Sequence, residues 1–218
     1  MPLDGEDDNS SPFNSCVLWL DSRYFTESYW WDISPYRNNG DVYGAVWKGN
    51  GFYFDGINDK VLCGSNQSLQ ISDAISVEAW IEVGEDDSYL GIISRNFWSG
   101  WLVRREGNNK LMVRLKFADG TNSGEIEGGS ITVNKGICQC VFTYDKDNDD
   151  VIRLYINGEE VKVSDSMNNK AIKTGGITCI GLVDVDYFKG KIFRVRIFRK
   201  LLTRSEIQIL YDSEYRKV

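Results

Sequence analysis

Short segments in which apolar and polar residues alternate recur along most of the chain, and turn residues separate them. The clearest example is residues 51–81, where Phe52 and Phe54 occupy alternate positions before a turn at 55–59, and a longer apolar segment follows at 75–81. Alternation with a period of two is typical of a strand with one buried face, whereas a helix repeats every 3.6 residues. This segment therefore predicts a hairpin that leads into a long central strand.

The same alternation predicts further strands, with turn residues roughly every 8–12 positions. Pairs such as Asn157-Gly158 are typical of two-residue hairpin turns. Regular spacing of this kind favours an antiparallel sandwich over alternating strands and helices. We expect the additional strands at 16–21, 29–34, 41–47, 89–95, 101–106, 111–117, 137–144, 151–156, 159–163 and 190–198.

Near the end of the chain a strand pattern gives way to a helix pattern. Apolar and basic residues alternate in 190–198, which predicts that Ile192, Arg194 and Arg196 share one face and that this face is in contact with water. A threonine followed three residues later by a glutamate is the signature of a capping box, and it predicts one short helix at 203–211. The fold class that we expect is all-β with a single short C-terminal helix.

The length and the composition favour one folded domain preceded by an arm. A compact chain of 218 residues buries roughly 70% of the surface that it exposes when unfolded, which is enough for one core. No apolar segment approaches the roughly 18 residues that a transmembrane helix needs. Residues 1–15 are acidic and polar, so we expect them to form a flexible N-terminal arm that becomes ordered on a partner, while 16–218 form the domain.

The charge and the residue types exclude several classes of function. A formal net charge of −7 produces a long-range field that repels phosphate backbones and anionic lipids, so we expect neither nucleic acid nor a membrane as partner. The chain contains no histidine, which removes the commonest general base and the commonest zinc ligand. Its five cysteines are an odd number, so at least one thiol is unpaired in a monomer, which favours folding in a reducing compartment.

The central segment carries the first specific motif. Phe54-Asp55-Gly56, followed by Asp59, precedes the strand that holds Trp80. This arrangement resembles the laminin-G-like, concanavalin-A-like domains. The resemblance extends over roughly 16–211 and implies a two-sheet antiparallel jelly-roll sandwich. Members of that family mostly bind ligands and do not catalyse reactions, which is the expectation for this chain.

The beginning and the end of the domain match the same family. The entry segment has Asp21 at the end of the first predicted strand, Asp32 within the second, and then Asn38-Asn39-Gly40. This entry is especially similar to the laminin-G-like modules of phage structural proteins. The chain closes with a Gly-x-Ile start, a Val-Arg-Ile strand and a Leu-Thr helix, as that family does.

A pair of glutamates is the only arrangement that suggests catalysis. Glu78 and Glu82 lie on either side of Trp80 on one predicted strand, and glycoside hydrolases use two carboxylates in this way. The residues between them include Ala79 and Ile81, where a hydrolase would present further polar groups. Together with the absence of histidine and of a Gly-x-Ser-x-Gly elbow, this predicts that the protein is not an enzyme.

Acidic turn residues suggest a structural calcium site. The fold that the resemblance implies brings several of them towards one edge, and calcium requires six to eight oxygen ligands. The alternative is that Asp32, Asp55 and Asp59 cap their own turns through the local backbone. Relatives often carry acids just before the closing Val-Arg-Ile strand, where this chain has Phe193 and Arg194. The candidate calcium ligands are Asp21, Asp32, Asp55, Asn58 and Asp59.

Tryptophans in or beside the predicted loops suggest carbohydrate binding, because a sugar ring stacks on an exposed indole. Most aromatic residues of a sandwich belong to its core, and there we expect Trp19, Trp47 and Trp80. The consecutive pair at 30–31 would face opposite ways on an extended segment, leaving one indole near solvent. The candidate carbohydrate-binding residues are Trp30, Trp31, Trp98 and Trp101.

Two functions remain open at this point. The first is a non-enzymatic virion protein, such as a capsid decoration or fibre module, which folds in the host cytoplasm and docks on other virion proteins or a capsid lattice through residues 1–15. The phage-like entry segment and the unpaired thiol favour it. The alternative is a lectin-like carbohydrate-binding module of a secreted or cell-surface protein, and a glycan ligand suits either function. The sequence leaves open whether the protein is a homo-oligomer.

Overall fold

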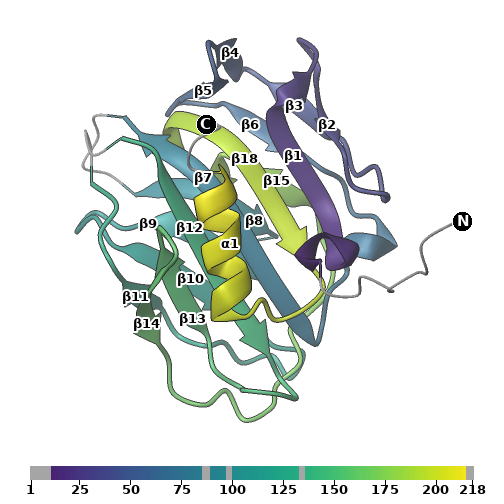
Figure 1. Cartoon of the computed structure of the whole chain (residues 1–218), viewed down its shortest axis with the longest axis vertical. Helices are drawn as coiled ribbons and strands as arrows, with labels where there is room; N and C mark the ends of the chain where they lie inside the picture. Colours follow the sequence, from purple (N-terminus) through teal and green to yellow (C-terminus); the bar gives the residue numbers. More distant parts are fainter. Residues whose placement is uncertain (1–10, 85–88, 97–99, 133–135, 215–218) are drawn as a thin grey trace, which may run out of the picture.

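The computed structural model describes residues 11–84, 89–96, 100–132 and 136–214, and these residues form an antiparallel β-sandwich with one α-helix outside it (Figure 1). The first strands are β1 (Cys16–Phe25), β2 (Tyr29–Asp32), β3 (Gly40–Tyr43), β4 (Val46–Lys48), β5 (Gly51–Asp55) and β6 (Lys60–Leu62). The middle strands are β7 (Ala74–Val83), β8 (Leu90–Arg95), β9 (Trp101–Arg105), β10 (Leu111–Leu115), β11 (Ile126–Gly128) and β12 (Cys138–Asp145). The last are β13 (Arg153–Ile156), β14 (Glu159–Val163), β15 (Thr178–Ile180), β16 (Leu182–Val183), β17 (Asp186–Tyr187) and β18 (Lys189–Phe198).

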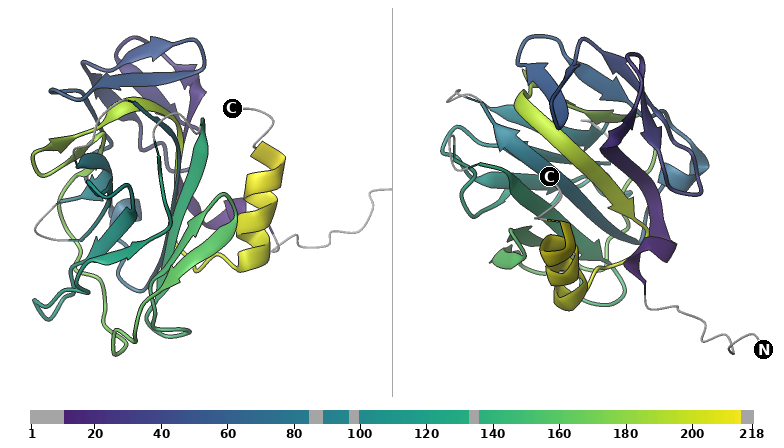
Figure 2. Two further views of the ribbon diagram at one scale, coloured as in Figure 1. Left: turned by 90° about the vertical axis from the view of Figure 1, so that its left-hand side faces the viewer. Right: turned by 45° about the horizontal axis from the view of Figure 1, so that its top comes forward.

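One continuous path of hydrogen-bonded strands makes both layers of the sandwich. The order is β11-β10-β9-β8-β15-β6-β3-β2-β1-β18-β7-β12-β13-β14, with β5 pairing to β18 and β4 to β5. Figure 2 shows the two layers facing each other, with the helix α1 (Arg204–Glu214) lying against the outer side of one of them. Trp101 of β9 and Phe142 of β12 meet between the layers, with ring centroids 5.7 Å apart. This confirms the predicted all-β antiparallel sandwich with one short C-terminal helix.

Strand β7 is the centre of the packing because both of its faces are buried. Val77 and Ile81, on one face, belong to the large core between the layers. Glu78 and Trp80, on the other face, are also fully buried, because α1 covers that side of the layer. A second apolar cluster joins α1 to the sheet below it, through residues that include Ile207 and Leu210. The helix therefore forms a third, partial layer outside the two layers of the sandwich.

The capping box predicted for the helix is confirmed. The hydroxyl of Thr203 accepts a hydrogen bond from the backbone N–H of Glu206 at 3.2 Å, and the carboxylate of Glu206 accepts one from the N–H of Thr203 at 2.9 Å. The helix runs three residues beyond the predicted 203–211. None of the helices in the described part of the chain is long and apolar enough to cross a membrane.

The closing strand β18 differs from its prediction in an important way. The pairing of β18 with β7 shifts register between Ile192 and Arg194, so Ile192 joins Val195 on the core side instead of sharing a face with the arginines. Arg194 and Arg196 do share the opposite face, but both are buried rather than in contact with water. The predicted wet face is therefore wrong, because additional segments cover it.

Each of these arginines is buried together with one carboxylate from a neighbouring strand. The Nη2 of Arg194 lies 2.6 Å from the Oδ2 of Asp21 on β1. The Nε of Arg196 lies 2.7 Å from the Oε2 of Glu78 on β7. A charge loses several kcal/mol of hydration when it is buried, so it is tolerated only with a partner of opposite sign. These ion pairs connect β18 to the strands on both sides of it.

Aromatic rings complete the cover over Arg196. Phe13 and Trp19 stack on each other with centroids 4.6 Å apart, and the guanidinium of Arg196 lies 5.1 Å from the ring of Trp19 and 5.4 Å from that of Phe13. Phe13 belongs to a short 3₁₀ helix, Pro12–Ser15, within the predicted arm of residues 1–15. The remainder of that predicted arm, residues 1–10, lies outside the described residues. The last part of the arm therefore packs on the domain.

All five cysteines are described, and all five are free thiols. Cys138 and Cys140 lie on one face of β12 as the spacing predicts, with their sulfur atoms 3.9 Å apart. Burial raises the pKa of Cys16 and of Cys179 to about 12. These two thiols therefore remain protonated and unreactive at neutral pH.

Replacement of Arg196 by methionine should lower the free energy of unfolding by about 3–5 kcal/mol, because Glu78 would remain buried without its ionic partner. The double variant Glu78→Gln/Arg196→Met should lose less than the sum of the two single variants, because the residues interact directly. Lys110→Met, in an exposed pair with Glu127 at 3.9 Å, should cost about 0.5 kcal/mol or less. Urea unfolding checks these values, and strictly additive losses would contradict the coupling.

Candidate functional site

Exposed aromatic side chains concentrate in the strands β1 to β4 and in the turns that connect them. Strand β2 shows why, because its residues alternate between exposed and buried. Tyr29 and Trp31 point outwards and stack with centroids 5.4 Å apart, while Trp30 and Asp32 point inwards. The exposed aromatic residues of this region are Tyr24, Tyr29, Trp31, Tyr36, Tyr43 and Trp47. Exposed aromatic side chains gathered in one region are typical of binding surfaces.

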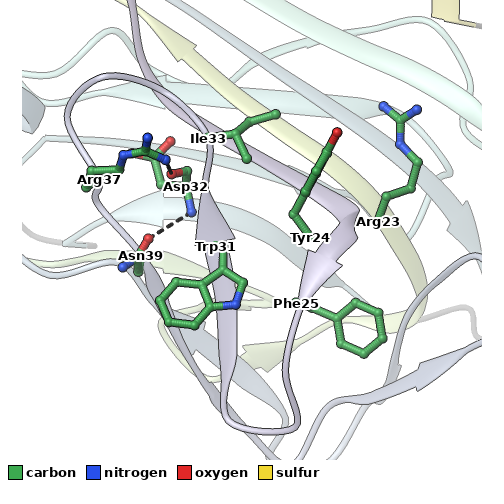
Figure 3. A pocket seen from close by; sticks show the side chains of 8 residues that line it. All are labelled: Arg23, Tyr24, Phe25, Trp31, Asp32, Ile33, Arg37 and Asn39. Carbon is green, nitrogen blue, oxygen red and sulfur yellow. Dashed lines mark hydrogen bonds between the residues drawn. The ribbon is translucent and has the colours of Figure 1, made fainter.

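The larger of two neighbouring pockets lies beside this surface, where the end of β1 meets β2. Its volume is about 570 Å³, within the range typical of ligand sites. Figure 3 shows Trp31 and Ile33 on one segment and Tyr24 and Phe25 on the other. The remaining lining residues are Arg23, Asp32, Arg37 and Asn39. The pocket therefore combines an indole, a phenol, two guanidinium groups and an amide.

The buried carboxylate of Asp32 organises the loop at the rim of this first pocket. Its Oδ1 accepts hydrogen bonds from the backbone N–H groups of Trp19 and Ser34, both at 2.8 Å. Its Oδ2 accepts one from the N–H of Asn38 at 2.6 Å. The backbone N–H of Asp32 donates in turn to the Oδ1 of Asn39 at 3.0 Å (Figure 3). The loop is thus held from inside, which fixes the positions of the residues that it presents.

Arg37 is presented by this loop in a strained backbone conformation. Its φ is 54°, in the left-handed region that side chains other than glycine rarely adopt. Such a residue costs of order 1–2 kcal/mol and is found where the surrounding structure imposes it, often at functional sites. Its Nη1 lies 3.3 Å from the carbonyl oxygen of Asp32, and its guanidinium lines the first pocket. Arg37 therefore supplies hydrogen-bond donors at a defined position.

A second pocket, with a volume of about 320 Å³, adjoins the first and shares Arg23 and Phe25 with it. Trp47 of β4 forms part of its wall, stacking on Phe25 with centroids 5.1 Å apart. The indole N–H of Trp47 donates to the carbonyl oxygen of Ser22 at 3.1 Å, which fixes the ring. The other lining residues are Asp21, Ser22, Gly49, Asn50 and Arg194.

Asp21 lies between two arginines at the floor of the second pocket. Its carboxylate accepts hydrogen bonds from Nε and Nη2 of Arg23, both at 2.7 Å, and from Nη2 of Arg194 at 2.6 Å. Burial raises the pKa of Asp21, but the hydrogen bonds from Arg23 and the charge of Arg194 outweigh it and lower the pKa from 3.8 to about 2. Asp21 is therefore ionised at neutral pH, with a positive charge on each side.

The structure corrects the prediction of carbohydrate-binding tryptophans. Trp31 is 39% exposed and lines the first pocket, as a binding indole would. Trp30 and Trp101 are instead buried in the core between the layers, so no sugar can stack on them. Trp98 lies outside the described residues. Trp47, expected in the core, is 40% exposed in the second pocket, because β4 is a short strand on the outer side of β5.

The predicted calcium ligands are not gathered into one site. Asp21 and Asp32 are occupied by the arginines and backbone donors described above. Asp55 accepts a hydrogen bond from the N–H of Ile57, and Asp59 accepts one from the N–H of Asp55, both at 2.8 Å. Asn58 is an exposed residue of the same turn. Within the described ranges no group of three or more His, Cys, Asp or Glu residues could hold a metal ion. Asp32, Asp55 and Asp59 cap their own turns, which was the alternative.

The glutamate pair of β7 does not form a hydrolase site. Glu78 is fully buried, and its Oε1 accepts hydrogen bonds from Trp80 Nε1 at 2.9 Å and Gln139 Nε2 at 2.7 Å. Its other oxygen pairs with Arg196. A polysaccharide cannot reach a carboxylate enclosed beneath α1. Glu78 therefore has a structural position.

The fold and these pockets can now be compared with known proteins. Residues 54–208 match the family model of the concanavalin A-like lectin/glucanases superfamily. This chain belongs to that superfamily. A search of curated protein sequences finds no match.

Solved structures with this lectin-like fold include binding domains of bacterial toxins. The binding domain of Paraclostridial Mosquitocidal Protein 1 has a TM-score of 0.74 and 18% identity over 94% of this chain and 53% of its own. The binding domain of Botulinum neurotoxin DC has been solved with SialylT and with rat synaptotagmin II. Both structures have a TM-score of 0.72 over 93% of this chain, with 20% identity for the first and 19% for the second. The match covers 52% of that domain, so this chain spans about half the length of these structures. At 18–20% sequence identity, the similarity shows that these domains share the fold of this chain.

The free energy of unfolding should depend on Asp21 in acid. The pKa of this group is lower in the folded protein, about 2 against 3.8, so its contribution is complete above about pH 4 and is lost as the pH falls through about 2. The contribution is about 2 kcal/mol. Chemical unfolding between pH 5 and pH 2 should show a steeper loss for the wild type than for Asp21→Asn. Parallel profiles would contradict this linkage.

Melting curves recorded with excess calcium and with a chelator should coincide, because the acids that were predicted to bind the ion instead accept hydrogen bonds from arginines and backbone N–H groups. Differential scanning fluorimetry provides the measurement. A calcium-dependent rise of about 5 °C or more, abolished by Asp55→Ala, would instead restore the predicted site.

Proposed function

We propose that this domain is a non-enzymatic glycan-binding module and that its ligand stacks on Trp31 in the first pocket. The observation that carries the proposal is the exposed indole of Trp31 beside polar groups that the loop of Asp32 holds in place. A pyranose ring has an apolar face, which suits an aromatic ring, and hydroxyl groups around its edge, which require hydrogen-bond partners. The first pocket offers both.

The polar groups of the first pocket are placed to bind hydroxyls. Arg37 and Asn39 come from the loop that Asp32 anchors, and Tyr24 comes from the end of β1. A rigid site loses little conformational entropy when it binds, so weak individual contacts can add up to useful affinity. The neighbouring stack of Tyr29 on Trp31 restrains the indole as well.

The superfamily and the structural neighbours support a binding role. The fold is lectin-like, and solved neighbours are binding domains, one of them in complex with SialylT and another with N-acetylneuraminic acid. This chain corresponds to about half of each neighbour, so those ligands indicate a class of function and not a position of contact. The position proposed here comes from the pockets of this chain alone.

The role in a virion stays a prediction. A glycan-binding module suits a virion surface and a secreted or cell-surface protein equally well, and the pockets favour neither location. The partners predicted for residues 1–15 and a homo-oligomer also stay predictions.

A glycan array probed with the wild-type domain should identify bound oligosaccharides, and Trp31→Ala should weaken their binding by about 2 kcal/mol, or about thirty-fold, because it removes the stacking surface. Trp31 is partly exposed, so the variant should retain its fold and melting temperature. Tyr89→Ala is the matched control, since Tyr89 is also an exposed aromatic residue but precedes β8, four strands from β2 in the sheet. Equal binding by the wild type and Trp31→Ala would refute this site.

A further inference from the structure

We infer that Trp47 is a second stacking position, so that the preferred ligand is a linear oligosaccharide with one sugar on Trp31 in the first pocket and another on Trp47 in the second. This inference rests on the proposed function, and it adds the shape of the ligand and a second residue that recognises it. Such a module binds several consecutive sugars of a chain, whereas a single pocket would select one terminal sugar.

The two pockets share a wall, which allows one chain of sugars to contact both. Arg23 and Phe25 line both of them. Phe25 lines the first pocket together with Trp31 (Figure 3), and its ring stacks on Trp47 of the second pocket. The volumes of about 570 Å³ and 320 Å³ together exceed what one sugar ring fills. A ligand of several sugars therefore fits this pair of pockets better than a monosaccharide does.

Trp47 has both properties that a stacking surface requires, because it is exposed and held in place. It is 40% exposed, its indole N–H donates to the carbonyl oxygen of Ser22, and its ring packs on Phe25. A restrained aromatic ring offers its apolar face to a ligand and loses little conformational entropy on binding. Trp31 meets the same two conditions, since it is 39% exposed and stacks on Tyr29.

The surroundings of Trp47 are anchored to the body of the domain. Phe25 makes an edge-to-face contact with Phe52 of the core, with ring centroids 5.5 Å apart. The turn that follows β4 is also fixed, because the hydroxyl of Ser22 donates a hydrogen bond to the carbonyl oxygen of Asn50. Asn50 is exposed and lines the second pocket, so its side-chain amide can donate to and accept from the hydroxyl groups of a sugar.

The aromatic wall, and not the charge of the floor, points to a sugar in the second pocket. The carboxylate of Asp21 accepts hydrogen bonds from both Arg23 and Arg194. A neutral ligand leaves each of these charges with its partner, while the exposed indole gains an apolar contact that water does not provide. Neutral sugar chains are therefore the appropriate probes.

Isothermal titration with chains of increasing length tests the inference. The probes are the maltose, cellulose and chitin series of oligosaccharides, each from one to six sugars. In at least one series the wild type should bind the longest member about tenfold tighter than the shortest member that binds, because the second stack adds to the first. Trp47→Ala should remove this gain and leave the affinity for the shortest member unchanged. Trp31→Ala should weaken binding at every length.

Two further variants keep the test decisive. Trp47→Met retains an apolar contact with Phe25 but has no ring, so it should also remove the gain, even if Trp47→Ala proves unfolded in a melting curve. Tyr43→Ala is the matched control, because Tyr43 is 49% exposed on β3 and lines neither pocket. This variant should bind every chain as the wild type does.

The possible failures are distinguishable. Affinity that does not rise with length, for chains whose binding requires Trp31, would overturn the second stacking position and leave the glycan site in place. Equal losses for short and long chains in a folded Trp47 variant would also overturn it, and so would a loss of the gain in Tyr43→Ala. A wild type that binds none of the three series would overturn this inference, and one that binds nothing on the glycan array either would overturn both proposals.

Discussion

Two buried arginines on β18 impose the main constraint on this structure. Each must keep its carboxylate partner, Asp21 on β1 or Glu78 on β7, because an unpaired charge in this layer would cost several kcal/mol. The pairs act across both edges of β18 and therefore favour one register among three neighbouring strands. The stacked rings of Phe13 and Trp19 lie over Arg196, and α1 covers the same side of the layer.

These two ion pairs extend from the buried interior to the proposed binding surface. The pair of Arg196 and Glu78 lies beneath α1, while the pair of Arg194 and Asp21 reaches the floor of the second pocket. Asp21 then restrains Arg23, two residues further along β1, where the strand emerges at the surface. The carboxylate that pairs with Arg194 in the sheet thus also orients a cation at the surface.

Much of the fold was predictable from local patterns, but the site was only partly so. The alternation in 75–81 and the capping box at Thr203 reflect local physics, and both predictions are confirmed. Alternation also predicts that Trp30 and Trp31 lie on opposite faces of their strand. It does not predict which of the two indoles faces the core. The two arginines of β18 show the same limit, because a polar face that other segments bury has the same sequence pattern as a face in water. Trp47 was misplaced because its exposure depends on the position of β4 at the outer side of β5.

The burial and pairing of Glu78 explain why this domain suits binding better than hydrolysis. A glycosidase requires two carboxyl groups that face a cleft and remain available to the substrate. Here Glu78, on the strand where such a pair would lie, is enclosed by α1 and bound to Arg196, Trp80 and Gln139. The part of that layer that α1 covers is therefore unavailable to a polysaccharide. Recognition is left to the strands that α1 does not cover, and among these β1, β2 and β4 combine exposed aromatic rings with restrained polar groups.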